Sequence, residues 1–437
     1  MLESQKKLTN GFYAILSLPA TAMGFALSVQ IAALSWILDT QYKLDIHEIG
    51  IVWAAGPLAG IIGQVLIGLI SDKVWFWGGR RRPFIIIGGI LASLMLFALP
   101  NIGLIKESIG FLDILAIALT VALTLDLAIN ISFNPTRSVI ADVTPEGVPR
   151  TKGYTWMQTI SGFFGVLAYV ISIVLGNYFL IYFGVFLVAA FSLIPLFFIT
   201  EPKVLGADLN AAESENSPAI TKSKSNIPEL LKIYFAHSFS WIGVQTMFVF
   251  IFAFIKEKFA AEGTPLDDKS VGQIISTSFA ILNTVGFVLP ILLLEPLSKR
   301  IGRVKTHTLS VAIMGGGYLG VLLFATSPWI MFLFMAVCGV GWAAIVSLPF
   351  AIQSEHVDKT RMGFFMGIFN LSVVIPQLFV SLVLGKIIAD SGDKSIIFMI
   401  CAGSLIISAA LWTLVKESKP DKNLGNSNNK EVLGGSH

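Results

Sequence analysis

Two ionisable residues lie inside one apolar stretch of this sequence. The stretch FLDILAIALTVALTLDLAINISFNPTRSVIAD contains Asp126 and Arg137, together with Asn130 and Asn134. The spacing i, i+4, i+8 and i+11 places all four on one face of a helix, with the two charges about 16 Å apart at 1.5 Å per residue. A charge at the centre of a membrane costs about 2.5 to 3.5 kcal/mol, so such residues face a polar cavity and mark pathways for ions or substrates.

This spacing leaves the two charges free to act separately. A carboxylate in a low-dielectric cavity holds a proton more readily than one in water, which suits Asp126 to loading a proton on one side of a membrane and releasing it on the other. Moving one charge inward gains about 2.3 kcal/mol per 100 mV. Arg137 can hold the hydroxyl groups of a polar substrate, or pair with a carboxylate on another span. In the alternative interpretation, polar neighbours satisfy both charges and their role is structural.

Other polar and aromatic side chains fall near the middle of predicted spans. The expected substrate ligands are Arg137, Asn130, Gln30, Trp241, Gln245, Asn283, Asn370 and Gln377. Trp36 and Trp156 offer further surfaces on which a sugar ring can stack, and His237 is a second candidate proton carrier. For any one of these residues, hydrogen bonding or packing between helices is the commoner role. As a set they suit a neutral, hydroxyl-rich solute.

The composition indicates that the bilayer is the solvent of this chain. Of its 437 residues, 55% are hydrophobic and 13% are charged, and the mean hydropathy is +0.78. Soluble proteins carry about a quarter charged residues, and a membrane span needs about 20 apolar ones. The apolar stretches predict twelve helices, at 11–38, 49–70, 84–105, 112–141, 154–176, 179–199, 229–255, 271–294, 306–325, 328–353, 362–387 and 395–415.

The polar segments divide the chain into two halves and fix its orientation. We expect an N-terminal six-helix bundle at 1–200, a linker at 201–228, a C-terminal six-helix bundle at 229–415 and a disordered tail at 416–437. Most Lys and Arg residues follow spans that end on the same side as the N-terminus. Because basic residues stay in the cytoplasm, both termini and the linker are predicted to be cytoplasmic in a multi-pass protein of the cell membrane.

The segment after the second span, SDKVWFWGGRRRPF, carries a cluster of charges. Asp72, Arg80, Arg81 and Arg82, with Asp142 after the fourth span, are expected to hold helix ends together through charge pairing and helix-end contacts, and so to act in gating. Topology alone would also explain the arginines. In neither interpretation are these residues substrate ligands.

The two halves resemble each other in sequence. GGRRRPF (78–84) after the second span is matched by IGRVKTH (301–307) after the eighth, so Gly79 corresponds to Gly302. Two parallel repeats of six helices form the architecture of the major facilitator superfamily, whose substrate site lies between the repeats near the membrane midplane. The predicted fold class is therefore an all-α membrane protein with twelve transmembrane helices in two pseudo-symmetric six-helix bundles.

Three groups of residues resemble the sucrose/proton symporters of plants and their animal relatives in solute carrier family 45. They are GPLAGIIGQVLIGLISDK (56–73) with GGRRRPFI (78–85), the fourth-span pattern Asp126-Leu-Ala-x-Asn130 with Pro135-x-Arg137 and Ala141-Asp142, and SLPFAIQS (347–354) with MGIFNLSVVIPQLFVS (366–381). The resemblance implies proton-coupled uptake of a glucoside such as sucrose or maltose. It also implies that Asp126 carries the proton and that Arg137 helps to bind sugar or to couple the two.

One departure concerns the seventh span. The plant carriers have an acidic Asp-Thr-Asp-Trp-Met-Gly-type stretch there, whereas VFIFAFIKEKFA (249–260) has no carboxylate before Glu257. Because of this difference, the sequence supports a bacterial-type carrier of maltose or a related disaccharide at least as well as it supports a sucrose carrier.

The sequence therefore predicts a secondary active, proton-coupled sugar importer that works by alternating access. We expect no enzymatic activity, cofactor, metal site or nucleic-acid partner. The expected partners are a sugar, a proton and membrane lipid, and the expected state is a monomer. Two alternatives stay open. A proton-coupled efflux antiporter of small organic solutes would have a more aromatic cavity with fewer amides, and a non-transporting sugar sensor would have a long ordered cytoplasmic domain.

Overall fold

The computed structural model describes residues 5, 7–60, 70, 74–144, 148–201, 225–357 and 362–417. Ten helices in these ranges are long and apolar enough to cross a membrane, and Ile396–Trp412 is a shorter apolar helix. Of the predicted second span, residues 61–69 lie outside the described ranges, as do Asp72, most of the predicted linker and most of the predicted tail. The predicted all-α membrane fold is confirmed.

The first group of helices covers the N-terminal half of the chain. It comprises α2 (Asn10–Thr40), α3 (Ile46–Trp53), α5 (Arg82–Ala98), α6 (Ile102–Ile109), α7 (Ile114–Val143), α8 (Val148–Leu175) and α9 (Asn177–Leu193). At the starts of α2, α3 and α7, the side chain before the helix accepts a hydrogen bond from a free backbone N–H group. Asp113, for example, accepts a hydrogen bond from the N–H of Ala116 at 2.7 Å and so begins α7.

The second group covers the C-terminal half. It comprises α10 (Ile227–Ala261), α11 (Asp268–Leu289), η3 (Pro290–Leu294), α12 (Glu295–Ile301), α13 (Arg303–Phe324), α14 (Pro328–Ile345), α15 (Leu348–Ser354), α16 (Met362–Phe379), η5 (Val380–Leu384), α17 (Gly385–Asp390) and α18 (Ile396–Trp412). Both η3 and η5 are single π turns, so a wider turn interrupts the α-helical hydrogen bonding in the spans that continue from α11 and α16.

The same neighbours recur in the two groups. Helix α2 packs against α8 and α9 just as α10 packs against α16 and α18, and α5 packs against α7 and α9 just as α13 packs against α14 and α18. Helices in corresponding places along the two halves of the chain thus have corresponding contacts. This recurrence is the structural counterpart of the sequence repeat.

Gly79 and Gly302, which correspond in the two halves, have the same structural role. Glu201 accepts hydrogen bonds from three successive backbone N–H groups at the start of α5, at 2.7 to 2.8 Å, and Glu417 accepts from two at the start of α13, at 2.6 and 3.1 Å. A carboxylate is favourable at a helix N-terminus. A Cβ on either glycine would lie 2.5 Å from a carboxylate oxygen of the capping glutamate, so each position requires glycine.

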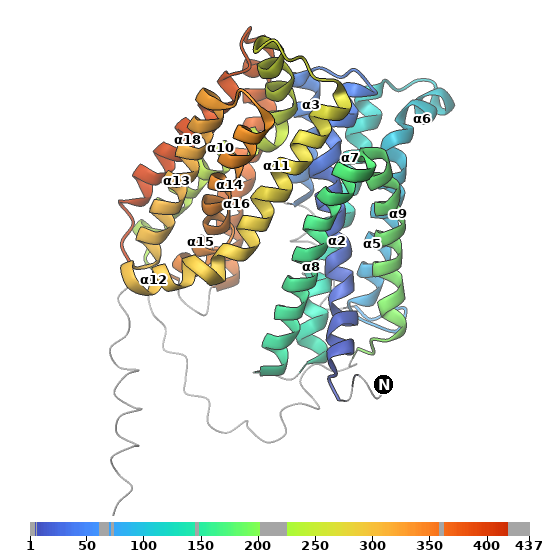
Figure 1. Ribbon diagram of the computed structural model, residues 1–437. Coiled ribbons are helices and arrows are strands. Elements are labelled where there is room, and N and C mark those ends of the chain that lie inside the picture. Colours follow the sequence, from blue (N-terminus) through green and yellow to red (C-terminus); the bar gives the residue numbers. More distant parts are fainter. Residues whose placement is uncertain are drawn as a thin grey trace, which may run out of the picture.

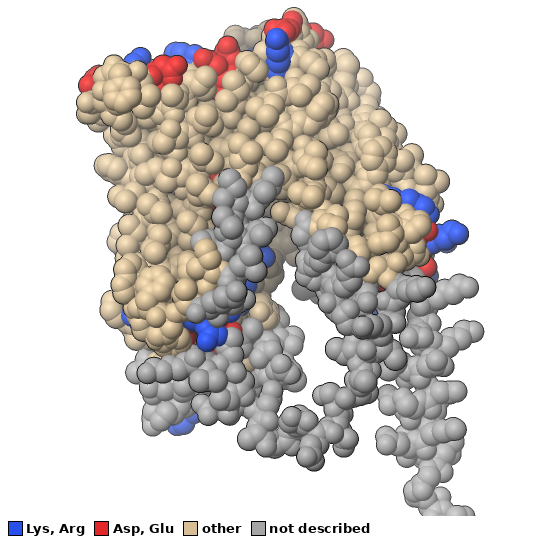
Figure 2. Space-filling model, turned by 180° about the vertical axis from the view of Figure 1, so that it is seen from behind, with Lys and Arg blue, Asp and Glu red and all other residues tan. Residues whose placement is uncertain are grey.

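The two groups meet at one end of the molecule and diverge at the other, where the N-terminus lies (Figure 1). We call these the closed end and the open end. At the closed end, the Ser35 hydroxyl donates to the carbonyl oxygen of Val249 at 3.0 Å, and the Trp36 indole donates to that of Asp268 at 2.8 Å. Figure 2 shows the hollow between the groups at the open end, and a wide belt almost without charged residues around the middle of the visible face.

Candidate functional site

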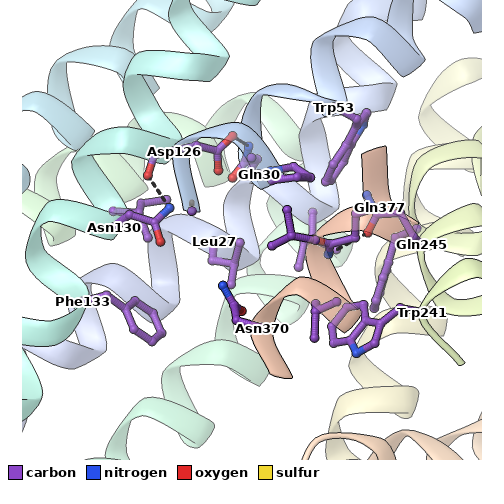
Figure 3. A pocket seen from close by; sticks show the side chains of 18 of the residues that line it. Leu27, Gln30, Trp53, Asp126, Asn130, Phe133, Trp241, Gln245, Asn370 and Gln377 are labelled. Atoms are coloured by element: carbon purple, nitrogen blue, oxygen red, sulfur yellow. Dashed lines mark hydrogen bonds between the residues drawn. The ribbon is translucent and has the colours of Figure 1, made fainter. Parts of the chain in front are cut away.

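A cavity of about 320 Å³ lies between the two groups of helices. Its polar lining consists of Gln30, Asp126, Asn130, Gln245, Asn370 and Gln377, and its aromatic lining of Trp53, Phe133, Trp241, Phe248 and Trp342. Within the described residues, Asp126 is the one charged member of this lining. Figure 3 shows Asp126 and Asn130 on one side of the cavity, facing Gln245, Gln377 and Trp241 on the other.

Asp126 is held by neutral groups from two other helical segments. The Gln30 amide of α2 donates to the Asp126 carboxylate at 3.0 Å, and the two side chains are only 2% and 7% exposed. A Cβ on Gly56 would lie 3.3 Å from the same carboxylate oxygen, so the backbone after α3 approaches Asp126 closely. Asn130 donates to the backbone oxygen of Asp126 at 2.8 Å. The carboxylate is thus buried beside an amide donor.

The opposite wall combines amides with aromatic rings. The Gln377 amide of α16 donates to Gln245 of α10 at 3.2 Å. The rings of Trp241 and Trp342 meet edge to face, with centroids 6.2 Å apart, and Phe248 packs against Trp342 at 5.5 Å. Amides can bind hydroxyl groups and ring faces can bind C–H groups, so this wall suits a solute with both.

Six of the eight expected substrate ligands line this cavity. Arg137 and Asn283 do not. The Arg137 guanidinium lies 4.2 Å from the centroid of the Phe133 ring, on the part of α7 that leads to the open end, and its side chain is exposed. Asn283 accepts a hydrogen bond from Trp342 at 3.3 Å. Trp36, considered for stacking, is engaged at the closed end instead.

Sequence reasoning missed four aromatic residues of the lining, Trp53, Phe133, Phe248 and Trp342. An aromatic residue in an apolar span is ordinarily interpreted as a residue that packs between helices or against lipid. A usable signal exists for Trp342, because Trp gathers at the ends of spans, where the membrane meets water. Trp342 lies well inside its predicted span, 328–353, and so departs from that pattern.

The arginine cluster after the second span lies at the open end, away from the cavity. Arg81 pairs with Asp142 at 2.9 Å, and both side chains are largely buried. Arg80 and Arg82 contribute backbone N–H groups to the cap formed by Glu201. In the second group, Arg303 pairs with Glu355 in the equivalent place, so each group has an ion pair beside a capped helix start. Asp72 lies outside the described residues.

A further charged contact joins the two groups at the closed end. The Lys256 ammonium of α10 lies 3.4 Å from a carboxylate oxygen of Asp39 in α2 and 3.1 Å from one of Asp268 in α11. The Lys256–Asp39 part of this contact could not be inferred from the sequence, because these two residues are 217 positions apart along the chain and belong to different groups, which meet only when this end is closed.

The fold and the cavity define a multi-pass membrane transporter of a small solute. The chain belongs to the major facilitator superfamily, whose family model matches residues 16–379 and again 264–433. Members of this superfamily are secondary transporters and not enzymes. Solved structures share the fold. They include the nucleoside transporter NupG, with a TM-score of 0.70 and 15% identity over 93% of this chain and 99% of NupG. The xylose transporter XylE from E. coli has a TM-score of 0.69 and 13% identity over 94% and 97%.

Distant similarity to sugar carriers, predicted from the sequence, is confirmed. Sucrose transport protein SUC4 of Arabidopsis thaliana is 24% identical over 411 residues, which cover 80% of this chain and 79% of SUC4. Sucrose transport protein SUT2 of Oryza sativa subsp. indica is 25% identical over 426 residues, covering 80% and 82%. A general alpha-glucoside permease of Schizosaccharomyces pombe is 30% identical over 107 residues, covering 22% of this chain and 19% of the permease.

Proposed function

We propose that this chain is a proton-coupled importer of a sugar, most simply a glucoside disaccharide such as sucrose or maltose. The observation that carries the proposal is Asp126, a buried carboxylate that is the one charge in the described lining of the cavity between the two groups. A charge in that position carries a large free-energy cost, and ionisable residues retained at such positions mark ion or substrate pathways. The opposite wall of amides and indoles suits a hydroxyl-rich ring, and the names of the distant relatives point to the same class of solute.

In this proposal each side chain has a distinct role. Asp126 takes up the proton, and the Gln30 amide supports the carboxylate, which differs from the role of sugar ligand expected from the sequence. Four amides, those of Asn130, Gln245, Asn370 and Gln377, bind sugar hydroxyls, and Trp241 stacks on the ring. Arg137 engages the sugar on its way between the cavity and the open end.

The gating residues act at the open end. When the two groups rock together to close that end, the Arg81–Asp142 and Arg303–Glu355 pairs and their capped helix starts hold each group rigid, so that the groups move as units. We propose that these units are the bundles 1–200 and 229–415, joined by the linker 201–228 and followed by the tail 416–437. With both termini in the cytoplasm of a monomer in the cell membrane, the cavity seen here opens inward.

The test uses purified protein in liposomes, with a panel of labelled sugars offered with and without an imposed pH gradient. The intact protein is expected to accumulate at least one glucoside when the outside is acidic. Asp126→Asn, which cannot change charge, is expected to lose accumulation by more than about tenfold while it still exchanges sugar for sugar across the membrane. Asp267→Asn changes an exposed carboxylate that caps the start of α11, and because asparagine caps helices equally well, this matched control should accumulate normally. Accumulation by Asp126→Asn against a sugar gradient would show that the proton site lies elsewhere.

The lining of the cavity also supports one alternative function, a proton-coupled efflux antiporter. Five aromatic residues of the described part of the chain line it, Trp53, Phe133, Trp241, Phe248 and Trp342, and the Asp126 carboxylate among these rings also suits an organic cation. A proton-coupled efflux antiporter would release protons from the liposome when substrate is added outside, whereas an importer would take protons up. A pH-sensitive dye inside the liposomes distinguishes the two directions.

A further inference from the structure

Both tryptophans of the amide-rich wall are hydrogen-bonded to side chains outside the cavity lining. The Trp241 indole donates to the Nε2 atom of His237 at 2.9 Å, and the Trp342 indole donates to the Oδ1 atom of Asn283 at 3.3 Å. Neither His237 nor Asn283 belongs to the lining. An indole has one donor, so each ring presents only its π face and its C–H edge to a solute.

His237 is fixed in position by the rings around it. It is 1% exposed and stacks on Phe369 of α16 with ring centroids 4.7 Å apart and an angle of 17° between the planes. Because its Nε2 atom accepts from Trp241, the imidazole is neutral and carries its proton on Nδ1. A second proton on the ring would displace the indole. His237 therefore serves Trp241 as a fixed acceptor, a role different from that of a proton carrier.

Trp342 is fixed by two features of α11. The Asn283 amide donates to the backbone oxygen of Phe279 at 2.9 Å, which directs its Oδ1 atom to the indole. One turn further along, a Cβ on Gly286 would lie 2.6 Å from the Cδ1 atom of Trp342, so the ring rests directly on the helix backbone. The hydrogen bond to Asn283 and the close packing on Gly286 thus fix the position of the Trp342 ring.

We propose that His237 and Asn283 are positioning residues that fix Trp241 and Trp342 as a rigid aromatic corner for the apolar face of a pyranose ring. This inference rests on the proposed function and deepens it. The two rings meet at an interplanar angle of 79°, so they form two walls of a corner. Because their indole N–H groups are already hydrogen-bonded, the two tryptophans contribute stacking on the sugar ring, and the neighbouring amides bind its hydroxyl groups. A site held in advance in this way loses less entropy when the sugar binds.

The first arm of the test measures the rings without any sugar. The full chain is labelled with 5-fluorotryptophan, and Trp241→Phe and Trp342→Phe assign the two fluorine signals. His237→Leu is expected to shift or broaden the Trp241 signal more than the Trp342 signal, while His237→Gln, which keeps an acceptor, leaves both near their original places. Asn283→Leu and Gly286→Ala are expected to move the Trp342 signal more than the Trp241 signal, because the two rings are in contact and one affects the other. Unmoved signals would overturn the anchoring itself, whether or not a sugar is carried.

The second arm measures uptake. A hydrogen bond of this kind contributes about 0.5 to 1.5 kcal/mol, so His237→Leu should raise the KM for the sugar by about 2- to 10-fold and leave the maximal rate within about twofold. In a Trp241→Phe background the same change should add almost nothing, because the two residues act through one contact. Moved signals with an unchanged KM would overturn the role in binding. Failure of the intact protein to take up any sugar would instead overturn the proposed function, and the fluorine signals would still decide the anchoring.

Discussion

At the scale of single residues, the Gln30 amide is suited to a partner that changes its protonation state. A primary amide has both a donor and an acceptor, so it can donate to the carboxylate of Asp126 and accept from the protonated acid after a rotation about its last torsion. The Gln30 Oε1 atom is buried and makes no hydrogen bond to the described residues, which leaves it available for that second arrangement. Neither state of Asp126 then leaves its neighbour without a hydrogen bond.

Gly56 and Gly60 give a matched test of this contact. Both line the cavity, but a Cβ on Gly56 would lie 3.3 Å from the Asp126 carboxylate, whereas a Cβ on Gly60 would meet no atom of the described residues within 4 Å. Gly56→Ala should therefore push the carboxylate away from Gln30 and lower proton-driven uptake by about 3- to 10-fold, a change of roughly 1 kcal/mol in this contact. Gly60→Ala should stay within about twofold of the intact protein. Equal uptake rates for the two variants would contradict the contact.

The polar residues of the site could largely be predicted from the sequence, but their partners could not. Asp126 and the amides can be predicted because a polar group in an apolar span carries a free-energy cost, and such a group is recognised from the sequence alone. That Gln30 bonds to Asp126, or that Asn283 bonds to Trp342, depends on how separate helices are rotated against each other. No spacing along the chain records that rotation.

At the scale of helices, hydrophobic length predicted the spans well, because a stretch of about 20 apolar residues has few alternatives to a membrane helix. The π turns were not predicted. The stretch 362–387 reads as one continuous helix, but η5 interrupts it. This turn brings the carbonyl oxygen of Ser381 to 2.6 Å from where a Cβ on Gly50 would lie, across the junction of the two groups. A contact of that kind comes from tertiary packing and leaves no periodic pattern.

Gly50 is therefore expected to govern how stable the closed end is. Gly50→Ala places a methyl group against a backbone carbonyl, which cannot move as a flexible side chain can, and overpacking of this kind costs about 1 to 3 kcal/mol. The contact exists only while the closed end is closed, so the variant should populate the arrangement that is open there. Gly24→Ala is the control, because a Cβ on Gly24 would meet no atom within 4 Å in the part of the chain that the structure describes.

The measurement is the labelling rate of a single cysteine. The native Cys338 and Cys401 are buried and are replaced by alanine, and Ser172→Cys is introduced at the closed end, where Ser172 is 1% exposed and lies 2.6 Å from Ser276 of the other group. A polar thiol reagent should label this cysteine about 5-fold faster or more in the Gly50→Ala background. An unchanged rate would mean that the junction adapts without opening.

At the scale of the whole molecule, the sequence predicted two repeated halves but not the arrangement in which they meet. The repeat is written in corresponding motifs such as those around Gly79 and Gly302. Which end is closed depends on a small difference in free energy between two arrangements of the same helices, and contacts such as Lys256 with Asp39 exist in only one of them. The structure thus shows which end is closed, and it identifies residues that stabilise this arrangement.

Lys256 is expected to bias this equilibrium modestly. Its side chain is 47% exposed, and exposed ion pairs contribute about 0 to 1 kcal/mol, so Lys256→Gln should increase labelling of Ser172→Cys by about 2- to 5-fold. High salt should reduce the difference, because the pairs are screened. Lys258→Gln is the matched control, since Lys258 pairs with Glu262 in its own group and has no ion pair across the junction among the described residues. If both variants label alike, the ion pairs at the closed end do not stabilise it, and the closure depends on the hydrogen bonds and the packing between the two groups.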